Sequence, residues 1–582
     1  MIFSLTERWL IRSWSSMSAD ELIFHLASSM KGANMDVVKR LIIFYYIPGF
    51  VLIILVLVCF ICLKSHVAKK IVVIFSLVIA FLGIVFSIID LDKETGLVRR
   101  IYSFNRTNLD SVDFIELNYC DASSVSFEFP EQKRNLIYIY LESMEMTFAD
   151  TNNGGAFEEN IIPNLTMLDV EYEDFSGNSE FLNGAYSLPS TDWTMAGMFA
   201  QSSGMPLKVA IRNDYSEIGF FPGLVTIGDV LAEAGYHQTL LIGSEAEFGG
   251  RGDFYSTHGC FDIHDYNFAL ENGWIPEGYK EWWGFEDSKL FEFAKEDISE
   301  LANGGEPFHY VILTADTHFE DGYVCELCKD EHEGNQYANV ISCSDRQVYE
   351  FVKWLMEQDF WDNTTVVLCG DHTTMDSDFC DDVPGDFSRR TFTVIINDVV
   401  EPIEGNAFRE YSTLDLFPTT LAAIGVKMSS DRLGLGVNLY SNSPTIIEEY
   451  GLEQCRISME AKSDFMITLS GEGKDVIEKM LDDTVVRMEF LEDENGPYLY
   501  MWGIGNLSYQ YVDDIYVDVT DTRTGRTERV TMVMDWGNEA NPYSCHAYVE
   551  YSSDEKQYLE AVGYICFNGM SAKEVVRIDA TE

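Results

Sequence analysis

Acidic and histidine side chains follow three separate apolar runs that have the character of buried strands. Glu142 comes after the run 135–141, His318 follows 308–313, and Asp371 and His372 follow 364–369. Two carboxylates and an imidazole are hard ligands that suit Mn²⁺, Mg²⁺ or Zn²⁺. Side chains at the ends of such strands also form turns and helix caps, so each residue alone is weak evidence for a site.

A candidate nucleophile lies in the stretch Ser190-Thr191-Asp192-Trp193-Thr194-Met195-Ala196-Gly197-Met198. We expect Ser190 or Thr191 to cap a helix that ends near Gly204. A capping hydroxyl stands among free backbone N–H groups, where a phosphate group binds well. A metal that touches the Thr191 oxygen would lower its pKa and make it a nucleophile, whereas the simpler interpretation is a helix cap alone.

Two further residues have the chemistry of phosphate ligands. Arg251 lies in the glycine-rich segment 248–253, and a guanidinium matches the geometry of a phosphate diester. His318 could bind the phosphate or protonate the leaving oxygen. A surface role for the arginine and a structural role for the histidine are the alternatives.

Alternating strand and helix patterns must position these residues. Expected strands at 135–141, 237–242, 308–313, 364–369 and 391–396 alternate with expected helices at 226–234, 344–358 and 414–424. Such alternation is typical of a parallel or mixed sheet with helices on both faces. Ligand sites in these sheets lie beyond the carboxyl ends of the strands, where the candidate residues are found.

The expected organisation has five parts. They are an N-terminal segment (1–40), two membrane helices (41–90), a linker (91–130), an α/β catalytic domain (131–452) and a C-terminal β-rich domain (453–582). The apolar runs 41–63 and 71–89 are each long enough to cross a bilayer. The C-terminal part has short strand-like runs separated by turn residues, which predicts a small β-sandwich.

Charge is distributed unevenly along the chain. The whole sequence has a net charge of −56, which divides into +4 for residues 1–100 and −60 for the remainder. So acidic a surface excludes nucleic acid as a partner. Three lysines between the apolar runs predict that this connector is cytoplasmic, so the segments before and after both spans face outward.

Twelve cysteines are consistent with an oxidising compartment. Cys325, Cys328, Cys343 and Cys380 are close in the sequence, and Cys325-Glu-Leu-Cys328 with His332 also has the spacing of metal ligands. We favour disulfides or a structural clasp over a metal here, and the pairing stays open.

Four segments taken in order resemble the phosphoglycerol transferases of the lipoteichoic acid synthase family, within the sulfatase and alkaline phosphatase superfamily. They are Asn135-Leu-Ile-Tyr-Ile-Tyr-Leu-Glu142-Ser, Ser-Thr191-Asp-Trp-Thr-Met-Ala-Gly-Met, Thr314-Ala-Asp-Thr-His318-Phe and Cys369-Gly-Asp371-His372. The resemblance covers about residues 135–445. It implies an α/β sulfatase-like sheet sandwiched by helices in a multi-pass protein of the bacterial cell membrane, with its catalytic domain outside the cytoplasm.

By this resemblance, Glu142, Thr191, Asp371 and His372 hold one divalent metal, most often Mn²⁺, and Thr191 is the nucleophile. Arg251 and His318 would contact the glycerol phosphate. The implied donor is phosphatidylglycerol, and the acceptor is a glycan or a glycerol-phosphate chain. A phosphoethanolamine transferase, a phosphodiesterase and a non-catalytic glycan-binding scaffold remain alternatives.

Overall fold

The computed structural model forms two compact units, one made of residues 1–212 and 225–463 and the other of 213–224 and 464–582. It describes residues 2–13, 18–27, 39–95, 113–179, 181–209, 219–376, 378–400, 408–471, 486–493, 496–502, 512–538, 541–549, 551, 555–567 and 573–579.

A seven-stranded sheet organises the first unit, with the strand order β3-β8-β7-β2-β6-β4-β5. The central strand β2 pairs in parallel with β7 and β6, and β4 pairs in parallel with β6 and β5. β8 is antiparallel to β7, so the sheet is mixed. The strands are β2 (Asn135–Leu141), β3 (Gly184–Ala185), β4 (His237–Ile242), β5 (Asp262–His264), β6 (Phe308–Leu313), β7 (Thr364–Gly370) and β8 (Thr391–Ile396).

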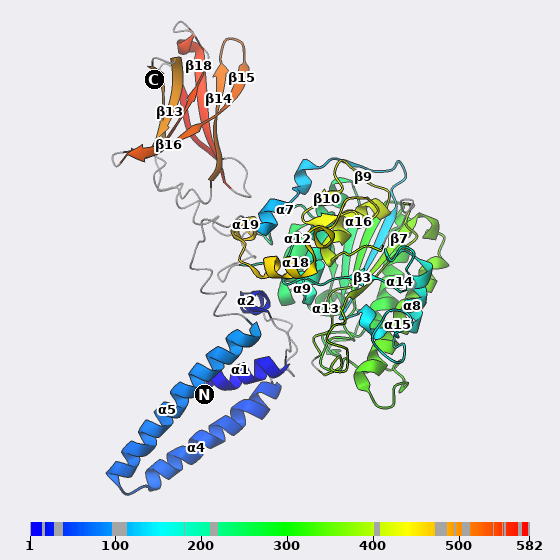
Figure 1. Ribbon diagram of the computed structural model, residues 1–582. Coiled ribbons are helices and arrows are strands. Elements are labelled where there is room, and N and C mark those ends of the chain that lie inside the picture. The colour runs from blue at the N-terminus through cyan, green and yellow to red at the C-terminus, as the bar shows by residue number, and fades with distance from the viewer. Residues whose placement is uncertain are drawn as a thin grey trace. The chain divides into compact units, whose positions relative to one another are not determined.

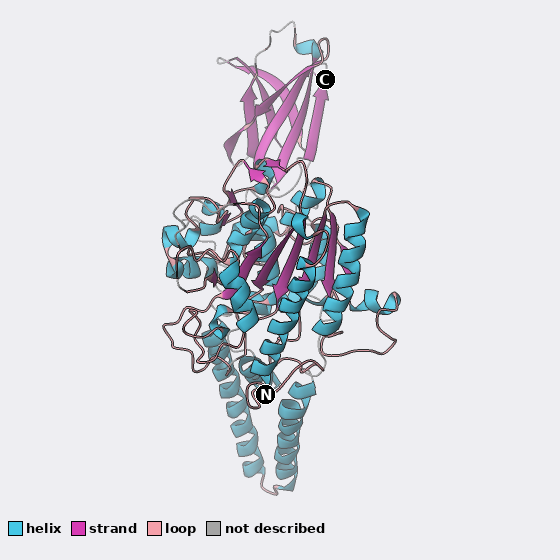
Figure 2. Cartoon of the chain, turned by 90° about the vertical axis from the view of Figure 1, so that its right-hand side faces the viewer, coloured by secondary structure: helices cyan, strands magenta, loops and turns pink. Residues whose placement is uncertain are grey.

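Both faces of this sheet are covered by helices (Figures 1 and 2). All seven residues of β2 are buried, as its β-branched and aromatic composition predicts. Alternate residues of β2 point to opposite faces: Ile137 and Ile139 belong to the apolar core under α8 (Pro163–Glu171), α14 (Asp287–Gly304) and α15 (Gln336–Met356). On the other face, the Tyr138 hydroxyl donates to Gln201 of α9 (Thr194–Ser203) over 2.8 Å. The expected α/β fold is confirmed.

One expected helix begins earlier in the structure than the sequence indicated. α15 begins at Gln336, eight residues before the expected start, because the Asn335 side chain caps it by accepting a hydrogen bond from Ala338 N. The other expected helices correspond to α11 (Ile227–Glu233) and α16 (Leu416–Ala423).

The N-terminal part of the first unit is helical. α1 (Ile2–Ser13) and α2 (Ala19–Ala27) precede two helices that are long and apolar enough to cross a membrane, Leu41–Cys62 and His66–Lys93. Only 6% of each apolar window is buried within the protein. These helices are therefore not packed as core helices are, and their length and composition suit a membrane.

The second unit contains two antiparallel four-stranded sheets with orders β12-β13-β17-β16 and β15-β14-β18-β19. Side chains from both sheets share one apolar core that includes Leu499, Met501, Val517 and Ile565, so the unit is a β-sandwich. Its strands are β12 (Arg487–Asp493), β13 (Gly496–Trp502), β14 (Val512–Asp521), β15 (Arg526–Thr531), β16 (Val533–Asn538), β17 (Asn541–Tyr548), β18 (Leu559–Phe567) and β19 (Lys573–Asp579).

One strand-like run of the second unit, 530–534, is divided in the structure. Residues up to Thr531 belong to β15 in one sheet, and residues from Val533 belong to β16 in the other. Met532 between them is buried, and its N–H donates to Ile515 O over 2.7 Å. The chain therefore crosses between the sheets inside what reads as one apolar run.

Candidate active site

Two neighbouring strands deliver three candidate ligands to one edge of the sheet. Leu141 at the end of β2 lies opposite Gly370 at the end of the parallel strand β7. The residues that follow, Glu142 on one side and Asp371 and His372 on the other, are therefore adjacent. One ligand atom from each lies within 4.8 Å of the others, and all three side chains are buried.

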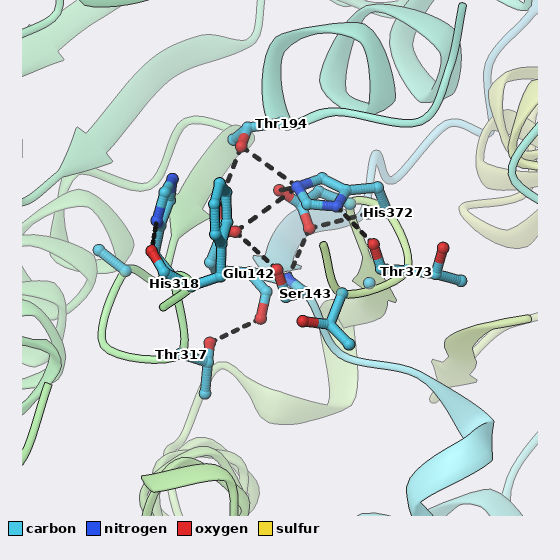
Figure 3. A network of polar contacts seen from close by, with 12 residues as sticks. Glu142, Ser143, Thr194, Thr317, His318, His372 and Thr373 are labelled. Carbon is cyan, nitrogen blue, oxygen red and sulfur yellow. Dashed lines mark hydrogen bonds and ion pairs between the residues drawn. The ribbon is translucent and has the colours of Figure 1, made fainter. Parts of the chain in front are cut away.

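Hydrogen bonds hold the two carboxylates in place (Figure 3). The backbone N–H of Ser143 donates to Asp371 Oδ1 over 2.8 Å, and its hydroxyl donates to Glu142 Oε1 over 2.8 Å. His372 Nε2 lies 3.5 Å from Glu142 Oε1 and 3.4 Å from Asp371 Oδ2. The imidazole nitrogen and both carboxylates thus face one small volume.

The chemistry of this set fits a divalent metal. Asp371 Oδ2 is buried and has no hydrogen-bond partner. His372 Nδ1 lies 2.9 Å from the carbonyl oxygen of Thr373, which can only accept, so Nδ1 donates. In the neutral ring Nε2 then presents a lone pair to the two carboxylates, which is the arrangement of a histidine metal ligand.

The electrostatics of the site also call for a cation. Burial, together with the charge of Glu142, raises the pKa of Asp371 to about 8. Burial alone would lower the pKa of His372, but Asp371 and Glu142 raise it to about 10. Burial would raise the pKa of Glu142, but the charges of His318 and His372 lower it to about 2. Two buried carboxylates therefore require a positive charge beside them, which a proton or a metal can supply.

Thr194 is the threonine that joins this cluster. It is the first residue of α9, and Trp193 is the N-cap. The Thr194 hydroxyl donates to Glu142 Oε2 over 3.2 Å and lies 3.3 Å from His372 Nε2 (Figure 3). The hydroxyl thus stands beside the candidate ligands at the positive end of a helix.

Thr191, the expected nucleophile and fourth ligand, is placed differently. The expectation that Ser190 or Thr191 caps the helix is wrong, because α9 begins three residues after Thr191. The fully buried Thr191 hydroxyl donates to Leu188 O and accepts from Leu188 N, both at 2.9 Å, and it contacts Thr413 Oγ1 at 3.4 Å. These bonds fix the turn that leads into the helix. Sequence reasoning missed Thr194, although it is the last residue with a hydroxyl before the stretch 195–200, which contains only small and apolar residues.

Glycines allow the close approach of the helix to the strand end. A Cβ on Gly197 would lie 2.0 Å from the backbone oxygen of Asp371, so only glycine lets the first turn of α9 contact this segment. A Cβ on Gly370 would lie 1.9 Å from Met144 O. Both glycines therefore help to bring Thr194 to the ligands.

The two expected phosphate ligands lie close to the cluster. Arg251 is buried, its Nη2 donates to Ser244 Oγ over 3.0 Å, and its Nε has no partner. Burial lowers the pKa of Arg251 to about 10, against the charge of Glu142, which raises it. Burial likewise lowers the pKa of His318, again against Glu142. The structure thus places both residues in electrostatic contact with Glu142.

Aromatic rings surround Arg251 and His318. The Phe248 ring contacts the Arg251 guanidinium, with 5.5 Å between its centroid and Cζ, and stacks on Trp283 at 5.2 Å. Trp283 also packs against His318 at 4.8 Å. Its Nε1 is buried without a hydrogen-bond partner, as is Arg251 Nε. Two N–H donors without acceptors therefore lie around one phenylalanine ring.

The N-terminal helix α2 packs beside the site, which no pattern in the sequence indicated. Asp20 Oδ2 accepts hydrogen bonds from Ser190 Oγ over 2.8 Å and from the fully buried Lys208 Nζ over 2.7 Å. The Phe24 ring lies 6.0 Å from the Trp193 ring. These contacts join a segment before the apolar helices to the residues around α9.

Two titratable groups of α2 reach the electrostatic field of the site. Burial and the charge of Asp192 raise the pKa of Glu21 to about 8, and His372 opposes this shift. Burial, His318 and Arg251 lower the pKa of His25 to about 4. The spacing of more than 160 residues between α2 and α9 explains why the sequence gave no local signal for this contact.

Comparison with known proteins finds a matching family model and similar sequences. The sulfatase family model matches residues 134–426, about half of the chain. Phosphoglycerol transferase I of Xanthomonas campestris pv. campestris (strain B100) is 28% identical over 414 residues, which cover 67% of this chain and 57% of that protein. Phosphoglycerol transferase I of Escherichia coli O139:H28 is 31% identical over 314 residues, covering 53% and 39%. This chain thus spans less than two thirds of the length of these relatives.

A solved structure, the lipoteichoic acid synthase LtaP from Listeria monocytogenes, is similar at 18% identity and a TM-score of 0.40, covering 55% of this chain and 79% of that one. The family model includes the strands that end just before Glu142 and Asp371 and the helix that begins at Thr194. The chain therefore belongs to the sulfatase family.

Proposed function

We propose that this protein is a membrane-anchored phosphoglycerol transferase. It would move glycerol phosphate from phosphatidylglycerol to a glycan or glycerol-phosphate acceptor outside the cytoplasm. The observation that carries the proposal is the position of the Thr194 hydroxyl, between Glu142 and His372 at the N-terminus of α9. A hydroxyl among metal ligands at a helix N-terminus is suited to nucleophilic attack on phosphorus.

In this proposal Glu142, Asp371 and His372 hold a divalent metal, with Mn²⁺ expected and Mg²⁺ or Zn²⁺ as alternatives. A metal bound there would lower the pKa of the threonine hydroxyl and neutralise charge on the phosphoryl group. Ser143 keeps both carboxylates oriented through its N–H and hydroxyl. The Thr194 hydroxyl donates a hydrogen bond to Glu142 Oε2, so the nucleophile is held beside one of the two carboxylates that Ser143 orients.

The first half of the reaction forms a glycerophospho-threonine. The Thr194 hydroxyl releases its proton to solvent water and its oxygen bonds to phosphorus, while the bond from phosphorus to the diacylglycerol oxygen breaks. His318 Nδ1 contacts the carbonyl oxygen of Phe319 at 2.6 Å and must donate to it, so Nε2 is free to exchange a proton. Protonated His318 would deliver its Nε2 proton to the leaving oxygen of diacylglycerol.

The donor phosphate would lie against Arg251 and Trp283. Their unpartnered Nε and Nε1 atoms are donors that a phosphate diester oxygen can satisfy. Phe248 and Trp283 supply apolar surface around those donors. In the second half of the reaction, an acceptor hydroxyl attacks the phosphorus, and the Thr194 oxygen leaves.

The apolar helices support a lipid donor. Leu41–Cys62 and His66–Lys93 would form a membrane hairpin, so the segments before and after it lie on the same side. The contacts of Asp20 with Ser190 and Lys208 require that same arrangement. We propose that this side is extracytoplasmic, as the lysine-rich connector predicts.

Transfer of phosphoethanolamine uses the same nucleophile and metal, and hydrolysis differs only in that water resolves the intermediate. A purified full-length chain in detergent should therefore be incubated with phosphatidylglycerol and phosphatidylethanolamine, each labelled in the headgroup. Fragment-ion mass spectrometry of the peptide containing Thr191 and Thr194 then identifies the modified residue and the group attached to it. We expect glycerol phosphate on Thr194, from phosphatidylglycerol only.

Four outcomes would contradict this proposal in different ways. Phosphoethanolamine on Thr194 would change the donor, and glycerol phosphate on Thr191 would change the nucleophile. Release of glycerol phosphate to water, without transfer to any added glycan, would indicate a phosphodiesterase. An unlabelled chain whose lipids stay intact, with Mn²⁺ present, would favour the non-catalytic scaffold.

A further inference from the structure

A second cluster of potential metal ligands lies apart from the three residues described above. The Sγ atoms of Cys325, Cys328 and Cys343 all lie within 4.8 Å of one another. Cys325 and Cys328 belong to the connection between β6 and α15, and Cys343 lies on α15 itself. Cys325 and Cys343 are buried and Cys328 is half-buried. The cluster thus joins a loop to a core helix.

The spacing of the sulfurs is that of thiolates around one metal. Cys325 Sγ is 3.7 Å from Cys328 Sγ and 3.7 Å from Cys343 Sγ. Zinc–sulfur bonds of about 2.3 Å in a tetrahedron place neighbouring sulfurs about 3.8 Å apart, whereas a disulfide joins its sulfurs at about 2.0 Å. Cys325, Cys328, Cys343 and Cys380 are free thiols, so the disulfides expected among these four residues are not present.

Three mutually adjacent sulfurs do not suit disulfide pairing, because any single bond leaves one thiol over. Each has two sulfur neighbours within reach, which matches three corners of a tetrahedron. The amide of Gln347, one turn after Cys343, adds a polar group at the edge of the cluster. Its Nε2 donates to Cys343 Sγ over 3.5 Å and to Cys325 Sγ over 3.9 Å, as a donor to a thiolate would.

We propose that Cys325, Cys328 and Cys343 bind one structural zinc ion as thiolates, with water in the fourth position and with Gln347 as a hydrogen-bond donor to the sulfurs. The three thiols lose their protons as the zinc binds. Zinc is chosen because sulfur-rich tetrahedral sites prefer it to the hard cations that suit carboxylates. His332, which the spacing also suggested as a ligand, is not part of the cluster: its Nε2 is bonded to Ser342 Oγ over 2.7 Å.

The ion would fix the segment that carries His318. That segment leaves β6 at Leu313 and runs through His318 to Cys325, seven residues later. Tyr323 N donates to Asp316 O over 2.7 Å, so the segment turns back on itself before the cysteines. Bonding Cys325 and Cys328 to Cys343 of α15 would anchor this segment to the core helix.

The test compares zinc content in full-length variants purified in detergent. Cys328→Ser removes a half-buried ligand with little change in volume, and Cys260→Ser removes an exposed cysteine elsewhere as the matched control. Metal content is measured by mass spectrometry of the digested protein. Zinc released by a thiol-blocking mercurial is measured with a colorimetric chelator. A metal held by Glu142, Asp371 and His372 has no thiol ligand and is insensitive to the mercurial.

We expect the mercurial to release about one zinc per chain from the wild type and from Cys260→Ser, and none from Cys328→Ser. Replacing the zinc by cobalt should give a thiolate-to-cobalt charge-transfer band that Cys328→Ser lacks. Equal zinc release from wild type and Cys328→Ser would overturn the proposal. A non-reduced peptide map that joins two of the three cysteines would overturn it in favour of a disulfide. Neither readout depends on transferase activity, so failure here is separate from failure of the proposed reaction.

Discussion

At the scale of single residues, two threonines three positions apart have different surroundings. The Thr194 hydroxyl contacts Glu142 and His372, whereas the Thr191 hydroxyl is bonded to the backbone of Leu188. The same stretch of sequence therefore contains a candidate nucleophile and a structural residue. Substituting each in turn separates the two roles.

We predict that Thr194→Ala lowers the rate of diacylglycerol release by at least about a thousandfold, because the attacking oxygen is lost. Thr194→Ser keeps a hydroxyl there and should retain measurable activity. Thr191→Ala should retain activity and lose about 1–3 kcal/mol of stability, since it removes the acceptor of the buried Leu188 N–H. The measurements are release of labelled diacylglycerol and a thermal melt of each variant. Normal activity in Thr194→Ala, with an inactive but folded Thr191→Ala, would reverse the assignment.

A buried acid far from any catalytic role makes stability depend on pH. Neither carboxylate oxygen of Asp169 has a hydrogen-bond partner, and its side chain is 2% exposed. Burial, with the charges of Asp174 and Glu173, raises its pKa well above the usual value. The folded chain therefore keeps a proton that the unfolded chain loses above about pH 4.

The sign follows from linkage: Asp169 stabilises the fold below its unfolded pKa, and this contribution is lost as pH rises toward the folded pKa. We predict that the melting temperature of Asp169→Asn falls less between pH 5 and pH 8 than that of the wild type. The free energy of unfolding of the wild type should fall, relative to that of Asp169→Asn, by about 1.4 kcal/mol for each pH unit in which only the folded state holds the proton. Parallel pH profiles for the two proteins would show that Asp169 is ionised in the fold.

At the scale of elements, the site depends on a close contact between α9 and the end of β7. A Cβ at position 197 would lie 2.0 Å from Asp371 O, and backbone atoms there cannot yield as a flexible side chain does. The helix must shift if any other residue replaces this glycine. That shift would separate Thr194 from the ligands that follow β7.

We predict that Gly197→Ala lowers transfer by about a hundredfold or more, since small displacements of a nucleophile have effects of that order. It should also cost about 1–3 kcal/mol of stability through overpacking. Gly304→Ala is the matched control, because a Cβ there meets nothing within 4 Å. Activity and melting curves of both variants test the contact. Wild-type activity in Gly197→Ala would show that the approach of α9 is not needed.

At the scale of the whole molecule, the two apolar helices and the position of α2 together constrain the membrane topology. A hairpin of two spans places α2 and the catalytic domain on one side, and Asp20 contacts Lys208 across that connection. The buried ion pair cannot form if a membrane separates its partners. The charge of the connector between the two helices predicts which side of the membrane this is.

We predict that a membrane-impermeant maleimide labels the exposed Cys260 in intact cells, or in spheroplasts if an outer membrane is present. A cysteine placed at Ser65, between the two helices, should react only after the membrane is opened, because the proposed topology places the lysine-rich connector in the cytoplasm. Labelled peptides are identified by mass spectrometry, and Cys260→Ser is the control. Labelling of the Ser65→Cys connector in intact cells, with Cys260 protected, would invert the topology.

Much of this protein follows from its sequence because the signals are local. Apolar runs such as 135–141 and 364–369 ended at the residues where β2 and β7 end or one residue before, and the alternation with helices predicted the layered α/β fold. Since parallel strands share one edge for their carboxyl ends, the meeting of Glu142 with Asp371 and His372 was also predictable. The two apolar spans needed only length and composition.

The tertiary structure decided the features that depend on the residue at which a helix begins and on contacts between residues far apart in the sequence. Thr191 and Thr194 are equally plausible as the first hydroxyl of a helix, and the bonds of Thr191 to Leu188 and Thr413 moved the start of α9 to Thr194. The contacts of α2 with the site join residues far apart in the sequence, where no periodicity can report them. For the three cysteines the sequence favoured disulfides over a metal, but spacing along the chain does not give the distances between sulfurs that distinguish the two. Only packing fixed those distances, and with them the second candidate metal site.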